Sequence, residues 1–125
     1  MRGSPSPFDW FDMARFGLFV HWGVYSLLGR GEQVLFRERL NPAEYEQLAS
    51  RFNPKKFDAD GWARAARDGG MKYAILTTKH HDGFCLFDSA LTEYCAPRAA
   101  AGRDFVAEYV QAFRRQGLRV GLYYS

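Results

Sequence analysis

The sequence has few cysteines, no long apolar run and no block of charge of one sign. Its two cysteines, Cys85 and Cys95, are too few for a disulfide framework, and their spacing matches no zinc-binding pattern. No segment approaches the ~20 continuous apolar residues that a membrane-spanning helix needs. The 17 Lys and Arg are scattered among 14 Asp and Glu, so no nucleic-acid surface is indicated. We therefore expect neither a membrane nor a nucleic acid as a partner.

The amino terminus also lacks the apolar segment of a secretory signal. Residues 1–9 are rich in Gly, Ser and Pro, which predicts a flexible start. The two cysteines are expected to be free thiols in a reducing compartment, and a cytoplasmic location is the prediction. By contrast, 47% of the residues are hydrophobic and 17% are aromatic, which is typical of a chain that buries a core.

Three short apolar runs, residues 16–22, 73–78 and 118–124, predict buried strands. Helical patterns lie between them, with starts at Asn41-Pro42, at Asp58 or Asp60, and at Asp104. Residues 23–40 are expected to form a long loop. Alternation of strands and helices predicts right-handed crossovers and a parallel sheet, and continuous apolar strands predict a sheet covered on both faces.

The same order of elements fits an open doubly wound sheet or a barrel. Bulky residues follow the first strand, from His21 to Tyr25, where a dinucleotide site needs close backbone approach, and this favours the barrel. A complete (β/α)8 barrel needs roughly 250 residues. The prediction is an α/β fold, an incomplete (β/α)8 TIM-like barrel of about the first three βα units. The last strand would then have an unpaired edge that promotes self-association.

Polar and aromatic side chains recur where each predicted strand ends. His21 and Trp22 end the first strand, His80 and His81 follow the second, and Tyr123 lies in the third. Loops at the carboxyl ends of parallel strands converge on one face, so these residues are expected to share a pocket. Neutral imidazoles donate to and accept from sugar hydroxyls.

Each candidate also has a plainer interpretation. Trp22 offers a flat apolar face to a pyranose ring or fills the core. Glu32, in the long loop, binds a hydroxyl, takes part in acid/base chemistry or is a solvated carboxylate. His80 and His81 are sugar ligands, metal ligands with Asp82, or histidines held by backbone carbonyls. Metal is disfavoured because adjacent residues on an extended strand point to opposite faces and a third ligand is not obvious.

Several runs, in order and spacing, closely resemble the amino-terminal part of α-L-fucosidases of glycoside hydrolase family 29. The resemblance extends from about Trp10 to Ser125, and the Lys79-His80-His81-Asp82-Gly83-Phe84 run is its most specific part. The other matching runs are residues 16–26, Gly31-Glu32, residues 85–89, Gly102-Arg103-Asp104 and residues 121–125.

The resemblance implies a catalytic barrel domain, of which residues 10–125 would be the truncated amino-terminal portion. It implies hydrolysis of terminal α-linked L-fucose from a glycan or glycoside, with retention of configuration and without metal or cofactor. His21, His80 and His81 would bind fucose hydroxyls, and Tyr123 would approach the ring.

The resemblance places Glu32 on a family glutamate near the sugar. Gln33 departs from the pattern, because the family commonly has Trp there. The nucleophilic aspartate and the acid/base glutamate of the family are expected beyond Ser125, and Asp82 and Asp88 match positions that are not nucleophilic. The isolated chain is therefore expected to be inactive. A sugar-binding fragment without hydrolytic activity and a metal-dependent barrel hydrolase remain as alternatives.

Overall fold

The computed structural model describes residues 6–125, so most of the predicted flexible start, residues 1–5, lies outside the described residues. Asp9, the last residue of that segment, already begins a helix. The elements, in chain order, are α1 (Asp9–Ala14), β1 (Gly17–Val20), η1 (Val24–Leu27), α2 (Val34–Arg37), α3 (Pro42–Glu46), η2 (Gln47–Arg51), α4 (Ala59–Asp68), β2 (Tyr73–Lys79), η3 (Ala96–Arg98), α5 (Phe105–Arg115) and β3 (Arg119–Tyr124).

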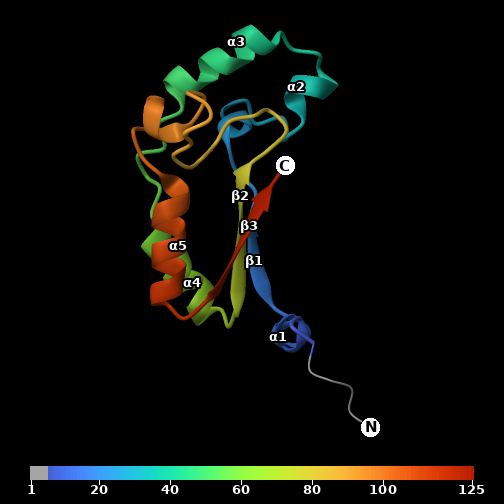
Figure 1. Cartoon of the computed structure of the whole chain (residues 1–125), viewed down its shortest axis with the longest axis vertical. Coiled ribbons are helices and arrows are strands. Elements are labelled where there is room, and N and C mark those ends of the chain that lie inside the picture. Colours follow the sequence, from blue (N-terminus) through green and yellow to red (C-terminus); the bar gives the residue numbers. More distant parts are fainter. Residues whose placement is uncertain (1–5) are drawn as a thin grey trace.

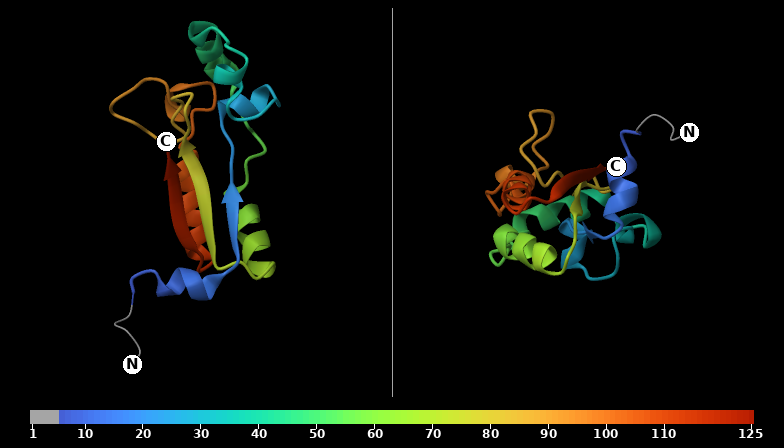
Figure 2. Two further views of the ribbon diagram at one scale, coloured as in Figure 1. Left: turned by 90° about the vertical axis from the view of Figure 1, so that its right-hand side faces the viewer. Right: turned by 90° about the horizontal axis from the view of Figure 1, so that it is seen from below.

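The three strands form one open sheet in the order β1-β2-β3, and both pairings are parallel. Val20 of β1 pairs with Leu76 of β2, which pairs with Leu122 of β3. The three arrows therefore point the same way, and their carboxyl ends lie at one edge (Figure 2). The predicted α/β class with parallel strands is confirmed.

Helices α4 and α5 cover one face of this sheet (Figure 1). Each begins at an aspartate whose side chain accepts a backbone N–H of the first turn: Asp58 from Gly61 and Asp104 from Ala107. Both caps lie where the sequence predicts them. The core between helices and sheet holds fully buried aromatic residues of α5, Phe105 and Phe113 among them.

The prediction of a sheet covered on both faces is wrong for the part of the chain that the structure describes. Phe19, which points away from the helices, keeps half of its surface exposed. The reason is geometric, since the inner face of a barrel strand is covered by strands across the barrel and not by helices. Helix α1 lies at the amino-terminal end of the strands (Figure 1). Its Phe11 ring packs against Tyr73 of β2, with 5.2 Å between ring centroids.

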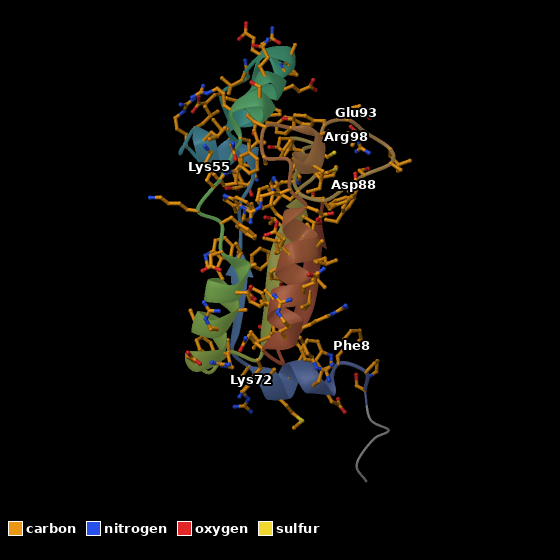
Figure 3. All side chains as sticks on the ribbon, turned by 90° about the vertical axis from the view of Figure 1, so that its left-hand side faces the viewer. Phe8, Lys55, Lys72, Asp88, Glu93 and Arg98 are labelled. Atoms are coloured by element: carbon orange, nitrogen blue, oxygen red, sulfur yellow. The ribbon has the colours of Figure 1, made fainter. Side chains whose placement is uncertain are left out.

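One connection differs from the expected loop. Residues 23–40, predicted as a long loop, contain the 3-10 turn η1 and the one-turn helix α2. Arg98 braces the segment that follows β2: its guanidinium lies 3.1 Å from an oxygen of Asp88 and 3.4 Å from one of Glu93, and it also bonds the Ser89 carbonyl (Figure 3). Cys85 and Cys95 are buried free thiols in the same region.

The outer edge of β3 has no partner strand among the described residues. Leu122 and Tyr124 on this strand are 55% and 67% exposed. Association of copies through this edge stays a prediction. No helix of the described chain has the length and apolar character needed to cross a bilayer.

Two buried threonines of β2 fix the chain on either side of this strand. The Thr77 hydroxyl accepts the backbone N–H of Trp22 at 3.0 Å and donates to the Trp22 carbonyl at 3.0 Å. The Thr78 hydroxyl donates to the Tyr123 carbonyl of β3 at 2.8 Å. Thr77 therefore holds the segment that carries His21 beyond the last paired residue of β1.

Replacing Thr77 by Val should destabilise the protein by about 1–3 kcal/mol, because the substitution preserves shape but leaves a part-buried donor and acceptor unpaired. Urea denaturation measures the loss. The same change at Thr78, which frees only a carbonyl, should cost less. An equal or smaller loss in Thr77→Val than in Thr78→Val would contradict this role.

Candidate active site

The carboxyl edge of the sheet brings together three of the residues singled out in the sequence. The ring centroids of His21 and His80 lie 4.8 Å apart, and Tyr123 lies 5.9 Å from His80 and 6.4 Å from His21. One of these residues comes from each strand end, since His21 follows β1, His80 follows β2 and Tyr123 belongs to β3. Parallel pairing is the cause, because it places the three strand ends side by side.

His80 lies at the centre of the cluster and is 6% exposed. Its Nδ1 atom is buried and has no hydrogen-bond partner within the described chain. Burial lowers the pKa of His80, and the neighbouring His21 and His81 lower it further, while Asp82 and Glu32 act in the opposite direction. At neutral pH the imidazole is therefore uncharged and both donates and accepts hydrogen bonds.

His81 stacks on His80 with 4.5 Å between ring centroids and an interplanar angle of 14°. β2 ends at Lys79, so the two histidines no longer follow strand alternation and lie on the same side. The expectation of opposite faces is therefore wrong. Phe36 of α2 contacts the His81 ring at 6.4 Å. Even so, within residues 6–125 no three His, Cys, Asp or Glu side chains are arranged to hold a metal ion.

Glu32 precedes α2 in the connection that folds back over the strand ends. Its carboxylate is close enough to His21 and His80 for both to act on its pKa. A backbone hydrogen bond of its own residue, followed by these two histidines and Arg37, lowers the pKa of the Glu32 carboxyl. The group is an anionic acceptor beside the histidine cluster. Gln33 is the residue at which α2 begins.

The Asp82 carboxylate makes two hydrogen bonds within the fold. One of its carboxylate oxygens accepts the Tyr45 hydroxyl at 2.7 Å, and the other accepts the backbone N–H of Phe84 at 3.2 Å. Burial and the hydrogen bond to Asp82 raise the pKa of Tyr45, so its hydroxyl stays protonated as the donor. This bond joins α3 to the turn that carries His80 and His81.

Trp22 lies apart from the cluster. Its ring stacks on Phe57 at 5.4 Å and also contacts Phe52 and Phe105, all within the aromatic core. Of the two roles that the sequence left open for Trp22, these contacts are those of a core residue. Although both residues follow the end of β1, Trp22 packs among the core rings while its neighbour His21 contacts His80 and Tyr123, and Thr77 holds the Trp22 backbone in this position.

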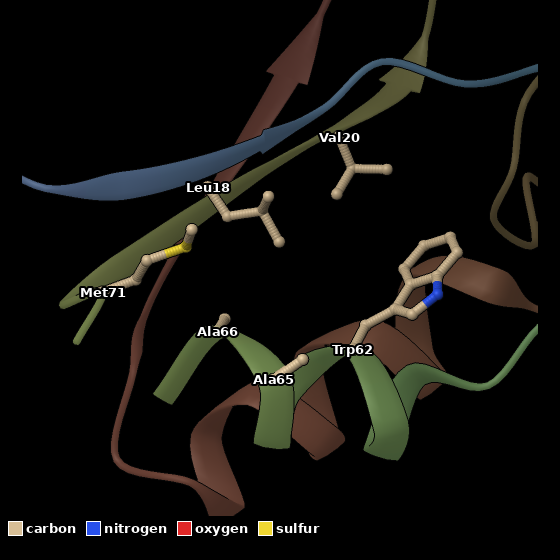
Figure 4. Close-up of a pocket in the computed structure, with 6 residues that line it drawn as sticks. All are labelled: Leu18, Val20, Trp62, Ala65, Ala66 and Met71. Carbon is tan, nitrogen blue, oxygen red and sulfur yellow. The ribbon is translucent and has the colours of Figure 1, made fainter. Parts of the chain in front are cut away.

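The apolar hollow between β1 and α4 is also separate from the cluster. It is lined by Leu18, Val20, Trp62, Ala65, Ala66 and Met71 (Figure 4). These side chains carry no acid, base or nucleophile, so the hollow offers no chemistry. The histidines and Glu32 singled out from the sequence lie instead at the carboxyl edge.

Three residues of the site were not identified from the sequence. Tyr25, Tyr45 and Thr77 each hold a candidate residue or its backbone in place. Their hydroxyls are buried or part-buried, and nothing local in the sequence distinguishes them from other core positions. The spacing of four residues between His21 and Tyr25 is the one sequence feature that could have indicated a contact between these two side chains.

A model of the α-L-fucosidase family matches residues 4–125. The chain belongs to the α-L-fucosidase family. It is similar to the tissue α-L-fucosidase of Rattus norvegicus, with 37% identity over 93% of this chain and 29% of that protein. The chain therefore spans about 29% of the length of this curated relative.

Solved α-L-fucosidases have the same fold over this region. Isoenzyme 1 from Paenibacillus thiaminolyticus is 55% identical, with a TM-score of 0.91 over 94% of this chain and 28% of that one. An enzyme from Bacteroides thetaiotaomicron is 36% identical, with a TM-score of 0.86 over 91% of this chain and 28% of that one. That enzyme was captured as a covalent intermediate with 2-fluoro-fucosyl fluoride.

The lowered pKa of His80 in this α-L-fucosidase family member predicts a pH-dependent stability. Because the folded-state pKa lies below the ordinary value of about 6.5, the unfolded chain binds a proton at His80 more readily. The free energy of unfolding should therefore decrease as the pH falls through about 6.5, and the contribution of His80 should be constant above that range.

Urea denaturation at a series of pH values measures this effect. His80→Gln should reduce the loss of stability on acidification. His81→Gln, which keeps the buried imidazole, should retain most of it. An unchanged pH dependence in His80→Gln would show that the buried imidazole is not its source.

Proposed function

We propose that this chain forms part of the fucose-binding pocket of an α-L-fucosidase that releases terminal L-fucose. The observation that carries the proposal is the convergence of His21, His80 and Tyr123 from three strand ends, with Glu32 beside them. Residues 10–125 would be the amino-terminal portion of its catalytic barrel domain. The substrate would be a fucosylated glycan or glycoside.

The cluster suits a ligand that carries several hydroxyl groups. A neutral His80 donates or accepts through Nε2 according to its tautomer, because its Nδ1 is buried, while the anionic Glu32 accepts only. The rings of His81 and Tyr123 flank His80 at 4.5 and 5.9 Å. Hydroxyls that both donate and accept would satisfy such a mixed set, whereas an anionic ligand would be repelled by Glu32.

For the reaction, we propose the retaining route through a covalent glycosyl-enzyme. This route needs two carboxyl groups about 5–5.5 Å apart, one as nucleophile and one as acid/base. Asp82 already accepts two hydrogen bonds and serves the fold, so it is a poor nucleophile. We propose that the carboxylate pair comes from polypeptide outside residues 1–125. The covalent intermediate captured in the Bacteroides enzyme supports the same route.

The two alternatives from the sequence predict different behaviour. A sugar-binding fragment would bind L-fucose without any hydrolysis in the whole protein. A metal-dependent hydrolase would retain zinc or manganese in stoichiometric amount and lose activity with a chelator. The placement of His21, His80 and His81 in this structure does not favour a metal site.

Titration of the purified chain with L-fucose tests the binding proposal. Chemical-shift changes should appear at His21, His80, His81 and Tyr123. His81→Ala should weaken binding by about tenfold, or about 1.4 kcal/mol, because it removes an exposed hydrogen-bonding group without disturbing the core. Lys55→Ala, on the exposed surface away from the cluster (Figure 3), should leave binding unchanged.

The same preparation should release no aryl alcohol from an aryl α-L-fucoside above a matched blank, since binding alone does not stabilise the transition state. Measurable release would contradict the placement of the carboxylate pair outside this chain. Absence of any shift with L-fucose, in a chain that is folded by circular dichroism, would contradict the binding proposal itself.

A further inference from the structure

A buried tyrosine lies directly behind one of the histidines of the cluster. The Tyr25 hydroxyl is 2.7 Å from Nδ1 of His21, and Tyr25 is 5% exposed. Tyr25 belongs to the 3-10 turn η1, only four residues after His21, so the turn itself brings the two side chains together. Its ring lies so close to Gly23 that a Cβ there would come within 2.8 Å of it. The position of the hydroxyl is therefore fixed by the backbone.

The direction of this hydrogen bond follows from the surroundings of the hydroxyl. His21 Nδ1 is the one hydrogen-bond partner that the described residues give the Tyr25 hydroxyl. The nearby Thr77 hydroxyl keeps a free lone pair, but its hydrogen bonds in these residues go to the N–H and the carbonyl oxygens of the chain around Trp22 and not to Tyr25. If Nδ1–H donated to Tyr25, the Tyr25 O–H would have no hydrogen-bonded acceptor among these residues. Leaving a buried donor unpaired costs about 1–3 kcal/mol, so the favoured arrangement has Tyr25 donating to a bare Nδ1.

The charges around Tyr25 are compatible with the same arrangement. Burial raises the pKa of Tyr25 to about 12; the Thr77 hydroxyl acts in the opposite direction, and the carboxylates of Asp82 and Glu32 act in the same direction as burial. The hydroxyl therefore keeps its proton throughout the neutral range and is able to donate it to Nδ1 of His21.

We propose that Tyr25 is a positioning residue that donates to Nδ1 of His21 and so holds His21 as the neutral Nε2–H tautomer. Nε2 is then the nitrogen of His21 that faces a ligand, and it acts there as a donor only. His80 differs, because its own Nδ1 has no hydrogen-bond partner among residues 6–125 and its tautomer is left open. The tautomer of His21 is inferred from the geometry of the hydrogen bond to Tyr25. That the Nε2–H group donates to an oxygen of the sugar rests on the proposed function.

Long-range proton–nitrogen correlation spectra of the imidazoles in this chain test the tautomer. In the unaltered chain, His21 should show a protonated Nε2 and a bare Nδ1. In Tyr25→Phe this preference should be lost, with a mixture of tautomers or a shift toward Nδ1–H. Tyr109→Phe is the matched control, because Tyr109 is fully buried and its hydroxyl donates to the Gly121 carbonyl, outside the cluster.

A protonated Nδ1 on His21 in the unaltered chain would overturn the proposal, and this result needs no variant to fold. A tautomer that is the same in Tyr25→Phe as in the unaltered chain would also overturn it. A loss of the preference in both Tyr25→Phe and Tyr109→Phe would show only that the fold is loosened, and it would overturn a specific role for Tyr25.

Titration of the same samples with L-fucose separates this proposal from the proposed function. If L-fucose binds, Tyr25→Phe should weaken binding by several-fold while Tyr109→Phe should not. If the unaltered chain does not bind L-fucose but His21 is the Nε2–H tautomer, the binding proposal is wrong and the role of Tyr25 in setting the tautomer is supported.

Discussion

Parallel pairing of three strands places His21, His80 and Tyr123 at one edge of the sheet. β2 is hydrogen-bonded to β1 on one side and to β3 on the other, so the chain leaves all three strands at the same end. Two threonine hydroxyls of β2 add hydrogen bonds to those between the strands: Thr77 holds the backbone of Trp22, and Thr78 holds that of Tyr123. The rings of His21, His80 and Tyr123 are in contact as a result.

Trp22 of the core and His21 of the site are adjacent in the sequence. Trp22 is held among Phe52, Phe57 and Phe105 on the helix-covered face, and His21 immediately before it lies on the open face beside His80. Trp22, partly buried, packs against the close-packed core, whose interior tolerates little displacement. The position of His21 is therefore tied through the backbone to a residue of the core.

The electrostatics of the cluster favour neutral hydrogen-bonding groups over charged ones. Burial and the proximity of the other imidazoles lower the pKa of His80, while burial also keeps the hydroxyls of Tyr25 and Tyr45 protonated. Glu32 is the anionic group at the rim. Neutral donors and acceptors of this kind are what the proposed function, binding of an uncharged sugar, requires.

The sequence by itself determined the strands, the capped helices and the family, because apolar periodicity, Asp58, Asp104 and the Lys79–Phe84 run are local patterns. It also identified His21, His80 and His81 from their places at the ends of predicted strands, Tyr123 within the last strand and Glu32 in the loop after the first strand. Only the tertiary structure decided that Trp22 belongs to the core, that His80 and His81 lie on the same side, and that Thr77, Tyr25 and Tyr45 support the site. Those outcomes depend on where a side chain points once the strand has ended, which no local pattern encodes. For Tyr45 and Thr77 they also depend on a hydrogen-bond partner 37 and 55 residues away.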